Sequence, residues 1–178
     1  MTYLYDGFHK IEAVNATVNG KKKQYEKLIL KDAIAGLVID QSGNMCLVEQ
    51  YRPTVGGMTY EIPAGVLDKE GLAPLGVLIE ELEEECLIPR KDIIEIDPLM
   101  LTKYYMVIGS TDAMIEIHVL RVKDQGKLFI ENPSDEVSAI HWFGPCRVNE
   151  MLIEGLIQDP KTIIAINHYL SLSRTHDL

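Results

Sequence analysis

The sequence predicts an α/β (α+β) fold in which a mixed β-sheet is sandwiched between helices. Three observations predict it: runs with strand periodicity fill much of the chain, one helical segment interrupts them near the middle, and two helical segments close the chain. Helices on both faces are a stable way to cover a sheet. The 178 residues, nearly half of them apolar, are enough to bury one substantial core.

The first half of the chain is rich in strand patterns. Residues 9–30 alternate in polarity on both sides of Asn19-Gly20, a dipeptide typical of a tight hairpin turn. Residues 33–40 form an apolar run typical of a buried strand, and residues 44–52 follow it after a polar turn. We therefore expect an N-terminal hairpin and then two core strands.

The second half begins with a helical period between Pro74 and Pro89. Strand patterns then resume at 92–101, 114–122 and 138–143. Two helices are expected at the C-terminal end, at 147–155 and 160–174.

Charge and composition exclude several classes of partner. A net charge of −10 opposes nonspecific binding to nucleic acid, and the one basic cluster, Lys21 to Lys23, follows the hairpin turn and is typical of a solvated loop. No stretch reaches the roughly 18 apolar residues that span a bilayer, and the N-terminus lacks the pattern of a signal peptide. We expect a cytoplasmic protein with neither a nucleic-acid nor a membrane partner. The odd number of cysteines favours reduced thiols.

The central helix carries a run of acidic residues. Helical spacing puts Glu80, Glu83 and Glu84 together, opposite an apolar side, with Glu81 and Glu85 on the flank. Like charges at this spacing cost about 0.2–0.5 kcal/mol per pair, and acids oppose the dipole at the C-terminal end of a helix. Two interpretations remain open from the helix alone: a solvated face, or a site for a hard cation such as Mg²⁺.

The segment before this helix favours the cation site over the solvated face. Residues 48–65, VEQYRPTVGGMTYEIPAG, followed by the acidic helix, resemble the Nudix hydrolases, and within them the ADP-ribose pyrophosphatase group. Two more segments resemble that group, YYMVIGSTD at 104–112 and EGLIQDPKTIIAI at 154–166. The resemblance implies a Nudix-like α/β/α sandwich at 31–178, preceded by a β-strand extension at 1–30.

The family motif is G-x5-E-x7-R-E-U-x-E-E-x-G-U, where U is aliphatic. With Gly65 at its start, the resemblance makes Glu80, Glu83 and Glu84 metal-binding carboxylates and gives Ala64 a backbone carbonyl for the metal, Mg²⁺ or Mn²⁺. The chain departs from the motif at three positions. They are Gly71 for the first glutamate, Ile79 for the arginine and Cys86 for the late glycine. We expect Ile79 to be buried.

The activity implied by the resemblance is metal-dependent hydrolysis of a nucleoside diphosphate linked to another moiety. ADP-ribose, cleaved to AMP and ribose 5-phosphate, is the substrate expected first. Glu83 and Glu84 are catalytic candidates, with one further acid, Asp135 or Glu136, from a loop. Two alternatives stay open: another nucleotide-sugar as substrate, or a catalytically impaired domain that binds a nucleotide-sugar as a sensor or interaction module.

Seven residues are candidates for binding the substrate: Arg52, Glu61, Gly65, Val66, Gly109, Ser110 and Thr111. A guanidinium at the end of an apolar strand either binds phosphate or pairs with a carboxylate, so Arg52 has two interpretations. Glu61 is accordingly either a hydrogen-bond partner for the substrate or a partner for Arg52. The N-terminal hairpin, which in the resembled group packs on a second subunit, predicts a homodimer.

Overall fold

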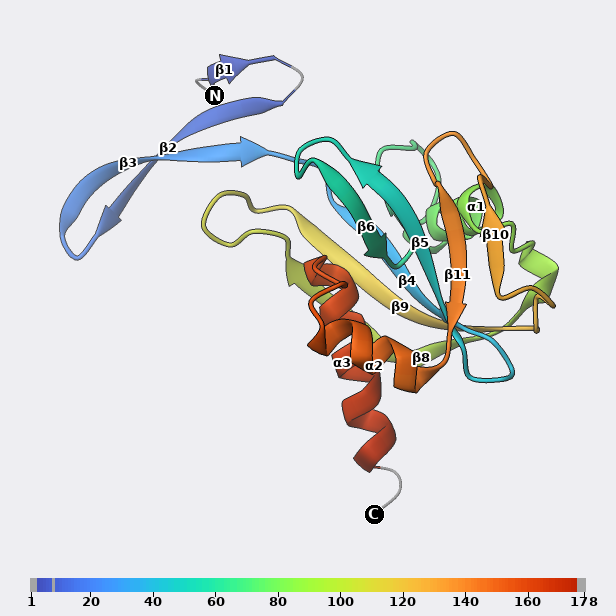
Figure 1. Cartoon of the computed structure of the whole chain (residues 1–178). Helices are drawn as coiled ribbons and strands as arrows, with labels where there is room; N and C mark the ends of the chain where they lie inside the picture. The colour runs from blue at the N-terminus through green and yellow to red at the C-terminus, as the bar shows by residue number, and fades with distance from the viewer. Residues whose placement is uncertain (1–2, 8, 176–178) are drawn as a thin grey trace.

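A computed structural model of the chain, which describes residues 3–7 and 9–175, contains two β-sheets (Figure 1). The smaller one is a three-stranded antiparallel sheet that extends from the body, in the order β1 (Tyr3–Asp6), β2 (Lys10–Val18) and β3 (Lys21–Ile29). Asn19 and Gly20 both have positive φ in the β2–β3 turn, as the expected hairpin requires.

The larger sheet has eight strands and forms the body. They are β4 (Ala33–Ile39), β5 (Met45–Arg52), β6 (Gly57–Glu61), β7 (Ala64–Val66), β8 (Ile93–Tyr105), β9 (Met114–Val122), β10 (Phe129–Glu131) and β11 (Ala139–Phe143). The main order is β10-β11-β5-β4-β9-β8, with β6 paired to β5 and β7 to β4. Because β4 and β9 run parallel while the other pairs are antiparallel, the sheet is mixed, as expected.

Helices cover both faces of this sheet. Helix α1 (Pro74–Glu85) packs on one face, and α2 (Pro145–Ile153) and α3 (Pro160–Thr175) lie on the other (Figure 1). Each face has its own apolar cluster, so β4, between the two clusters, is buried along its whole length. The predicted α/β/α sandwich is confirmed. Among the described helices, none has the length and apolar character needed to cross a bilayer.

The short strands β1, β6, β7 and β10 are not among the elements expected from periodicity. Segments of three to five residues are too short to show a clear alternating pattern, so the pairing of these strands depends on their neighbours rather than on their own sequence. The longer strands and all three α-helices lie where the periodicity predicts them.

Strands β4 and β5 of the large sheet are paired at one end and separate toward the other, and the short strands β6 and β7 fill the gap between them. The β4–β5 pairing is limited to Ile39 and Met45. Beyond that point β7 pairs with β4 and β6 pairs with β5. Side chains at the separated ends of β4 and β5 can therefore face a common hollow between them.

Helix α1 buries the apolar side that its spacing predicts. Leu78, Leu82 and Cys86 belong to the cluster on that face, and the side chain of Ile79 is only 7% exposed. The expected burial of Ile79 is confirmed. An apolar side chain therefore occupies the place that the motif, aligned from Gly65, gives to arginine.

We predict that Ile79→Arg destabilises the protein by about 3 kcal/mol or more, because it places an unpaired charge in the core. In a chain of this length the Tm should fall by roughly 6–12 °C. Val55→Arg is the matched control. Because Val55 is 70% exposed in the β5–β6 turn, the Tm of this variant should equal that of the parent. An unchanged Tm for Ile79→Arg, measured by calorimetry, would show that the helix turns this position to solvent.

Candidate functional site

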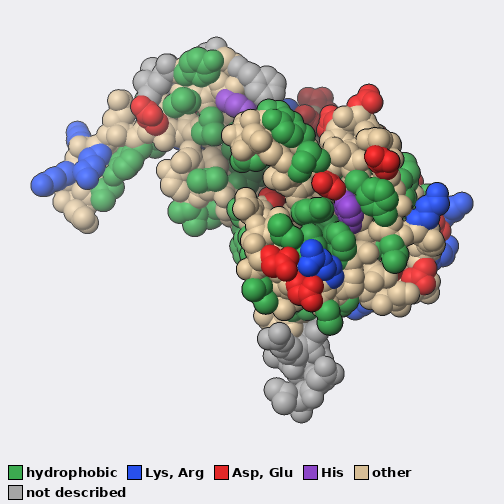
Figure 2. All heavy atoms as spheres, in the orientation of Figure 1, with side chains coloured by type: hydrophobic (Ala, Val, Ile, Leu, Met, Phe, Trp, Pro, Cys, Tyr) green, Lys and Arg blue, Asp and Glu red, His purple; other side chains and the backbone are tan. Residues whose placement is uncertain are grey.

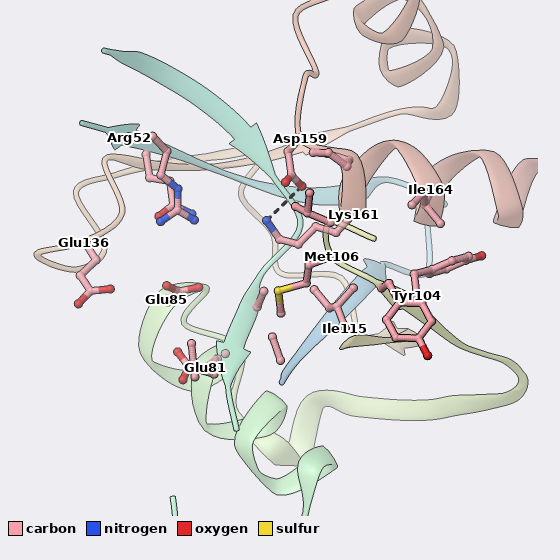
Figure 3. Close-up of a pocket in the computed structure, with 18 of the residues that line it drawn as sticks. Arg52, Glu81, Glu85, Tyr104, Met106, Ile115, Glu136, Asp159, Lys161 and Ile164 are labelled. Carbon is pink, nitrogen blue, oxygen red and sulfur yellow. Dashed lines mark ion pairs between the residues drawn. The ribbon is translucent and has the colours of Figure 1, made fainter. Parts of the chain in front are cut away.

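A cavity of about 640 Å³ opens beside the gap between β4 and β5. This volume suits a small-molecule ligand. The residues that line it include three groups (Figure 3). The acidic group is Glu81, Glu85 and Glu136, and the group that carries the cations is Arg52, Lys161 and Asp159. The apolar group is Tyr104, Met106, Ile115 and Ile164. The pocket thus has charged walls of opposite character and an apolar end.

Glu81 reaches the pocket because Gly65 has no side chain. A Cβ at Gly65 would lie 2.6 Å from Cγ and 2.7 Å from Oε1 of Glu81, so any other residue here would displace the side chain of Glu81. Burial raises the pKa of Glu81, and the negative charges of Glu84 and Glu136 raise it further against the opposing effect of Lys69. The start of the resembled motif therefore contacts Glu81 on α1.

Glu85 lies one turn further along α1 and is buried. Its Oε2 has no hydrogen-bond partner in the described part of the chain. Burial, with smaller contributions from Glu81 and Glu136, raises the pKa of Glu85 to about 7. A buried carboxylate oxygen that lacks a partner is costly unless something else binds it.

The chemistry of this acidic wall fits a divalent cation. Carboxylate oxygens are hard ligands of the kind that Mg²⁺ and Mn²⁺ prefer, and a cation would offset both the repulsion and the orphaned oxygen. The described side chains include no set of three potential ligands already gathered close enough to hold a metal ion.

The three carboxylates predicted from the motif do not gather at this wall. Glu80 points to solvent, where its Oε2 lies 2.6 Å from Nζ of Lys69. Glu83 is exposed and accepts a hydrogen bond of 2.9 Å from the backbone N–H of Arg90. Glu84 is exposed beside them. Of the five glutamates, the structure brings Glu81 and Glu85 to the pocket instead.

A shift of one residue in the motif accounts for this arrangement. The shifted motif puts glutamates at 81, 84 and 85, and its two aliphatic positions then fall on Leu82 and Ile88. Its late glycine falls on Leu87, which has φ of 56°, the left-handed conformation that favours glycine. The loop between Gly65 and α1 is therefore one residue longer than the motif specifies.

A signal for Glu85 was present in the helical spacing. Glu85 lies only about 20° from Leu78 around the helix axis, at the edge of the apolar side. The extra loop residue has no comparable signal, because an insertion in a turn changes no periodicity. Alignment from Gly65 assigns the three glutamates of the motif to positions 80, 83 and 84, whereas Glu81 and Glu85 line the pocket.

The cationic wall is organised by Glu61, which is 4% exposed. Arg52 donates two hydrogen bonds to its carboxylate, of 2.7 and 2.8 Å, and Thr59 donates a third of 2.7 Å. Lys161 adds an ion pair from the start of α3. Glu61 is thus the partner of Arg52, which was one of the two predicted interpretations, and Arg52 also lines the pocket.

Lys161 and Asp159 line the pocket but were not predicted as site residues. Both lie in the segment 154–166 that resembles the ADP-ribose pyrophosphatase group. The sequence alone does not show that the start of α3 folds against β6, because that contact joins residues about a hundred positions apart. The resemblance identifies the segment, and the folded structure shows its contact with β6.

The other predicted residues divide between the pocket and its surroundings. Ala64, Gly65 and Val66 line the pocket, and so does Glu136 in the loop between β10 and β11, whereas its exposed neighbour Asp135 does not.

The predicted loop at Gly109, Ser110 and Thr111 lies outside the pocket lining. The carbonyl oxygen of Ser110 accepts a hydrogen bond of 2.8 Å from the backbone N–H of Leu28, and the hydroxyl of buried Thr111 accepts one of 3.2 Å from the N–H of Ala113. The loop joins the N-terminal sheet to the body.

We predict that Glu61 makes stability depend on acid pH. Burial opposes its ionisation, but hydrogen bonds from Arg52 and the charge of Lys161 outweigh burial and lower the pKa of Glu61 to about 2, from 4.5. The stabilisation is complete above pH 4.5 and is lost as pH falls toward 2, an amount of about 3 kcal/mol.

Urea unfolding should therefore show Glu61→Gln to be less stable than the parent at pH 7, with a gap that narrows as pH falls from 5 toward 3. Glu70→Gln, at an exposed position, is the control and should follow the parent at each pH. A gap that stays constant across this range would contradict the ionised state of Glu61.

Comparison with known proteins shows the family of the chain. The NUDIX domain model matches residues 30–165. The chain is 29% identical to the ADP-ribose pyrophosphatase of Bacillus subtilis over an alignment of 162 residues. This alignment covers 86% of this chain and 80% of that protein. It is 43% identical over 53 residues to the ADP-ribose pyrophosphatase of Mycobacterium tuberculosis, covering 30% of this chain and 26% of that protein.

A third relative carries a different name. The chain is 27% identical over 154 residues to the methanol dehydrogenase activator of Bacillus methanolicus, covering 86% of this chain and 80% of that protein. The domain model spans well over half of the chain and includes the separated strands, the acidic helix and the start of α3. The chain therefore belongs to the Nudix domain family.

Proposed function

We propose that the protein hydrolyses the diphosphate bond of a nucleoside diphosphate linked to a sugar, with ADP-ribose cleaved to AMP and ribose 5-phosphate as the first candidate. One observation carries the proposal: a single pocket sets the carboxylates of Glu81 and Glu85 against the cations Arg52 and Lys161. A metal-bound diphosphate needs both kinds of group. The two pyrophosphatase relatives support this choice of substrate.

The pocket residues have different proposed roles: metal binding, orientation of a phosphate and acceptance of a proton. We assign metal binding to Glu81, Glu84 and Glu85 and to the carbonyl oxygen of Ala64. Bound Mg²⁺ or Mn²⁺ would neutralise diphosphate charge and lower the pKa of a coordinated water. Arg52, held by Glu61, orients a phosphate with the N–H groups that face the pocket. To Glu136, which lies on an exposed loop and lines the pocket, we assign acceptance of a proton from the attacking water.

The pocket has a place for the rest of the substrate. Tyr104, Met106, Ile115 and Ile164 form an apolar end next to the cations. A nucleoside base presents a flat apolar face, which such an end can cover. The proposed substrate then lies along the pocket, with its diphosphate between the charged walls.

A homodimer is part of the proposal. Figure 2 shows the N-terminal sheet projecting from the body, with lysine side chains at the outer end of its hairpin and hydrophobic side chains along it. Tyr5, Val18 and Tyr25 are exposed there. This three-stranded sheet extends from the body with apolar side chains exposed, and a second copy would cover them.

A second candidate function follows from the third relative. Because that protein is named as an activator of a dehydrogenase, this chain is also a candidate for acting on an enzyme partner. Hydrolysis and activation are distinguishable. A catalytically inactive Glu85→Gln variant that still stimulated a dehydrogenase would favour a binding role, whereas joint loss of both would favour hydrolysis.

We predict that hydrolysis of ADP-ribose requires Mg²⁺ or Mn²⁺ and that Glu85→Gln lowers kcat by about 10²–10⁴-fold, because it removes a charge from the metal site while keeping its shape. Glu84→Gln should also lower kcat. Glu83→Gln, in an exposed residue of the same helix, is the matched control for the motif register and should have a much smaller effect. A large loss in Glu83→Gln with full activity in Glu85→Gln would restore the unshifted motif.

For the dimer, we predict that light scattering gives about twice the chain mass of 20.0 kDa at micromolar concentration. Deletion of residues 1–30 should expose a surface that the hairpin covers, giving monomers or aggregates that bind substrate more weakly. Lys22→Glu, at the solvated tip, is a control that should leave the mass unchanged. A monomeric intact chain would contradict the dimer and leave the metal site unaffected.

A further inference from the structure

Lys161 is a partly buried cation on the wall of the pocket. Its side chain is 13% exposed, and its Nζ lies 2.5 Å from Oε2 of Glu61 and 3.1 Å from Oδ2 of Asp159. Figure 3 shows the ammonium group directed into the space that Arg52, Glu85 and Glu81 also border. Burial of a lysine is costly, so its position calls for a role that an exposed ion pair could not fill.

Attachment of α3 to the sheet does not explain this position. Asp159 accepts a hydrogen bond from the backbone N–H of Thr162 and closes the first turn of the helix. The hydroxyl of Thr162, which is fully buried, accepts a bond of 2.8 Å from the backbone N–H of Ile62. The second of these contacts ties the helix to the segment between β6 and β7 without Lys161.

Lys161 shares the pocket with the other cation and with the acidic wall. Arg52, Lys161, Glu81 and Glu85 all line the same cavity, and Figure 3 shows their side chains around one space. An ammonium group has three N–H donors, and Glu61 and Asp159 account for two of them. The N-terminal end of α3 adds positive potential at the same point.

We propose that Lys161 is a substrate-binding residue that contacts the diphosphate from the wall opposite Glu81 and Glu85, so that the diphosphate lies between two cations and the acidic helix. The inference rests on the proposed function. Arg52 alone presents a planar fork from one strand, whereas Lys161 supplies a point charge from a different element. Together the two cations recognise the two phosphates of one substrate.

The test is the kinetics of Lys161→Met with ADP-ribose and Mg²⁺. Loss of one charge-assisted hydrogen bond to substrate should raise KM by about 10- to 100-fold, with a much smaller change in kcat. Lys161→Arg keeps the charge and should recover most of the affinity. The matched control is Lys123→Met, which removes an exposed lysine paired with Asp92 at 3.0 Å and should leave KM unchanged.

Stability measurements separate binding from support of Glu61. If Lys161 served only to neutralise Glu61, the Tm of Lys161→Met would fall while KM stayed at the parent value, which would overturn the inference. Should Lys161→Met fail to fold, Lys161→Gln keeps a donor for Glu61 without the charge, and the same rise in KM is expected.

Calorimetric titration with ADP-ribose in Mg²⁺ keeps the two proposals apart. Parent hydrolysis with an unchanged KM in folded Lys161→Met overturns the role of Lys161 and leaves the proposed function standing. No hydrolysis by the parent, with ADP-ribose binding that Lys161→Met weakens, overturns the proposed function and supports the role of Lys161. A parent that neither hydrolyses nor binds ADP-ribose overturns both.

Discussion

The pocket depends on the hydrogen bonds that the carboxylate of Glu61 accepts. This carboxylate is almost fully buried at the end of β6, and it accepts hydrogen bonds from Arg52 on β5 and Lys161 on α3. Two consecutive strands and a helix about a hundred residues further along the chain are thereby held at one point. Loss of one member would leave buried charge without a partner, which is far more costly than loss of a surface ion pair.

The two walls of the pocket differ in how well their charges are satisfied. Arg52, Glu61 and Lys161 form a paired network, which keeps the pKa of Glu61 low. Glu81 and Glu85 face the same space without such pairing, and the pKa values of both are raised. Strain of this kind is typical of a site that binds an ion, because the missing partner comes with the ligand.

Much of the fold follows from periodicity and turn chemistry. The buried run of β4, the Asn19-Gly20 turn and the apolar side of α1 each agree with the structure, because each is local and repeated over several residues. The site is less predictable for two physical reasons. One extra residue before α1 rotates every glutamate by about 100° without altering the helical pattern. The approach of Lys161 to Glu61 is a tertiary contact that leaves no local pattern.

The loop between β8 and β9 contacts both the N-terminal sheet and the pocket. At its far end, Ser110 accepts a backbone hydrogen bond of 2.8 Å from Leu28 of β3, and Asp112 forms an ion pair of 3.0 Å with Lys27. At its near end, Met106 and Val107 form part of the pocket wall. One loop therefore borders both regions, so a ligand whose binding moved this loop and the sheet together would, by reciprocity, change the affinity for a partner bound to the sheet.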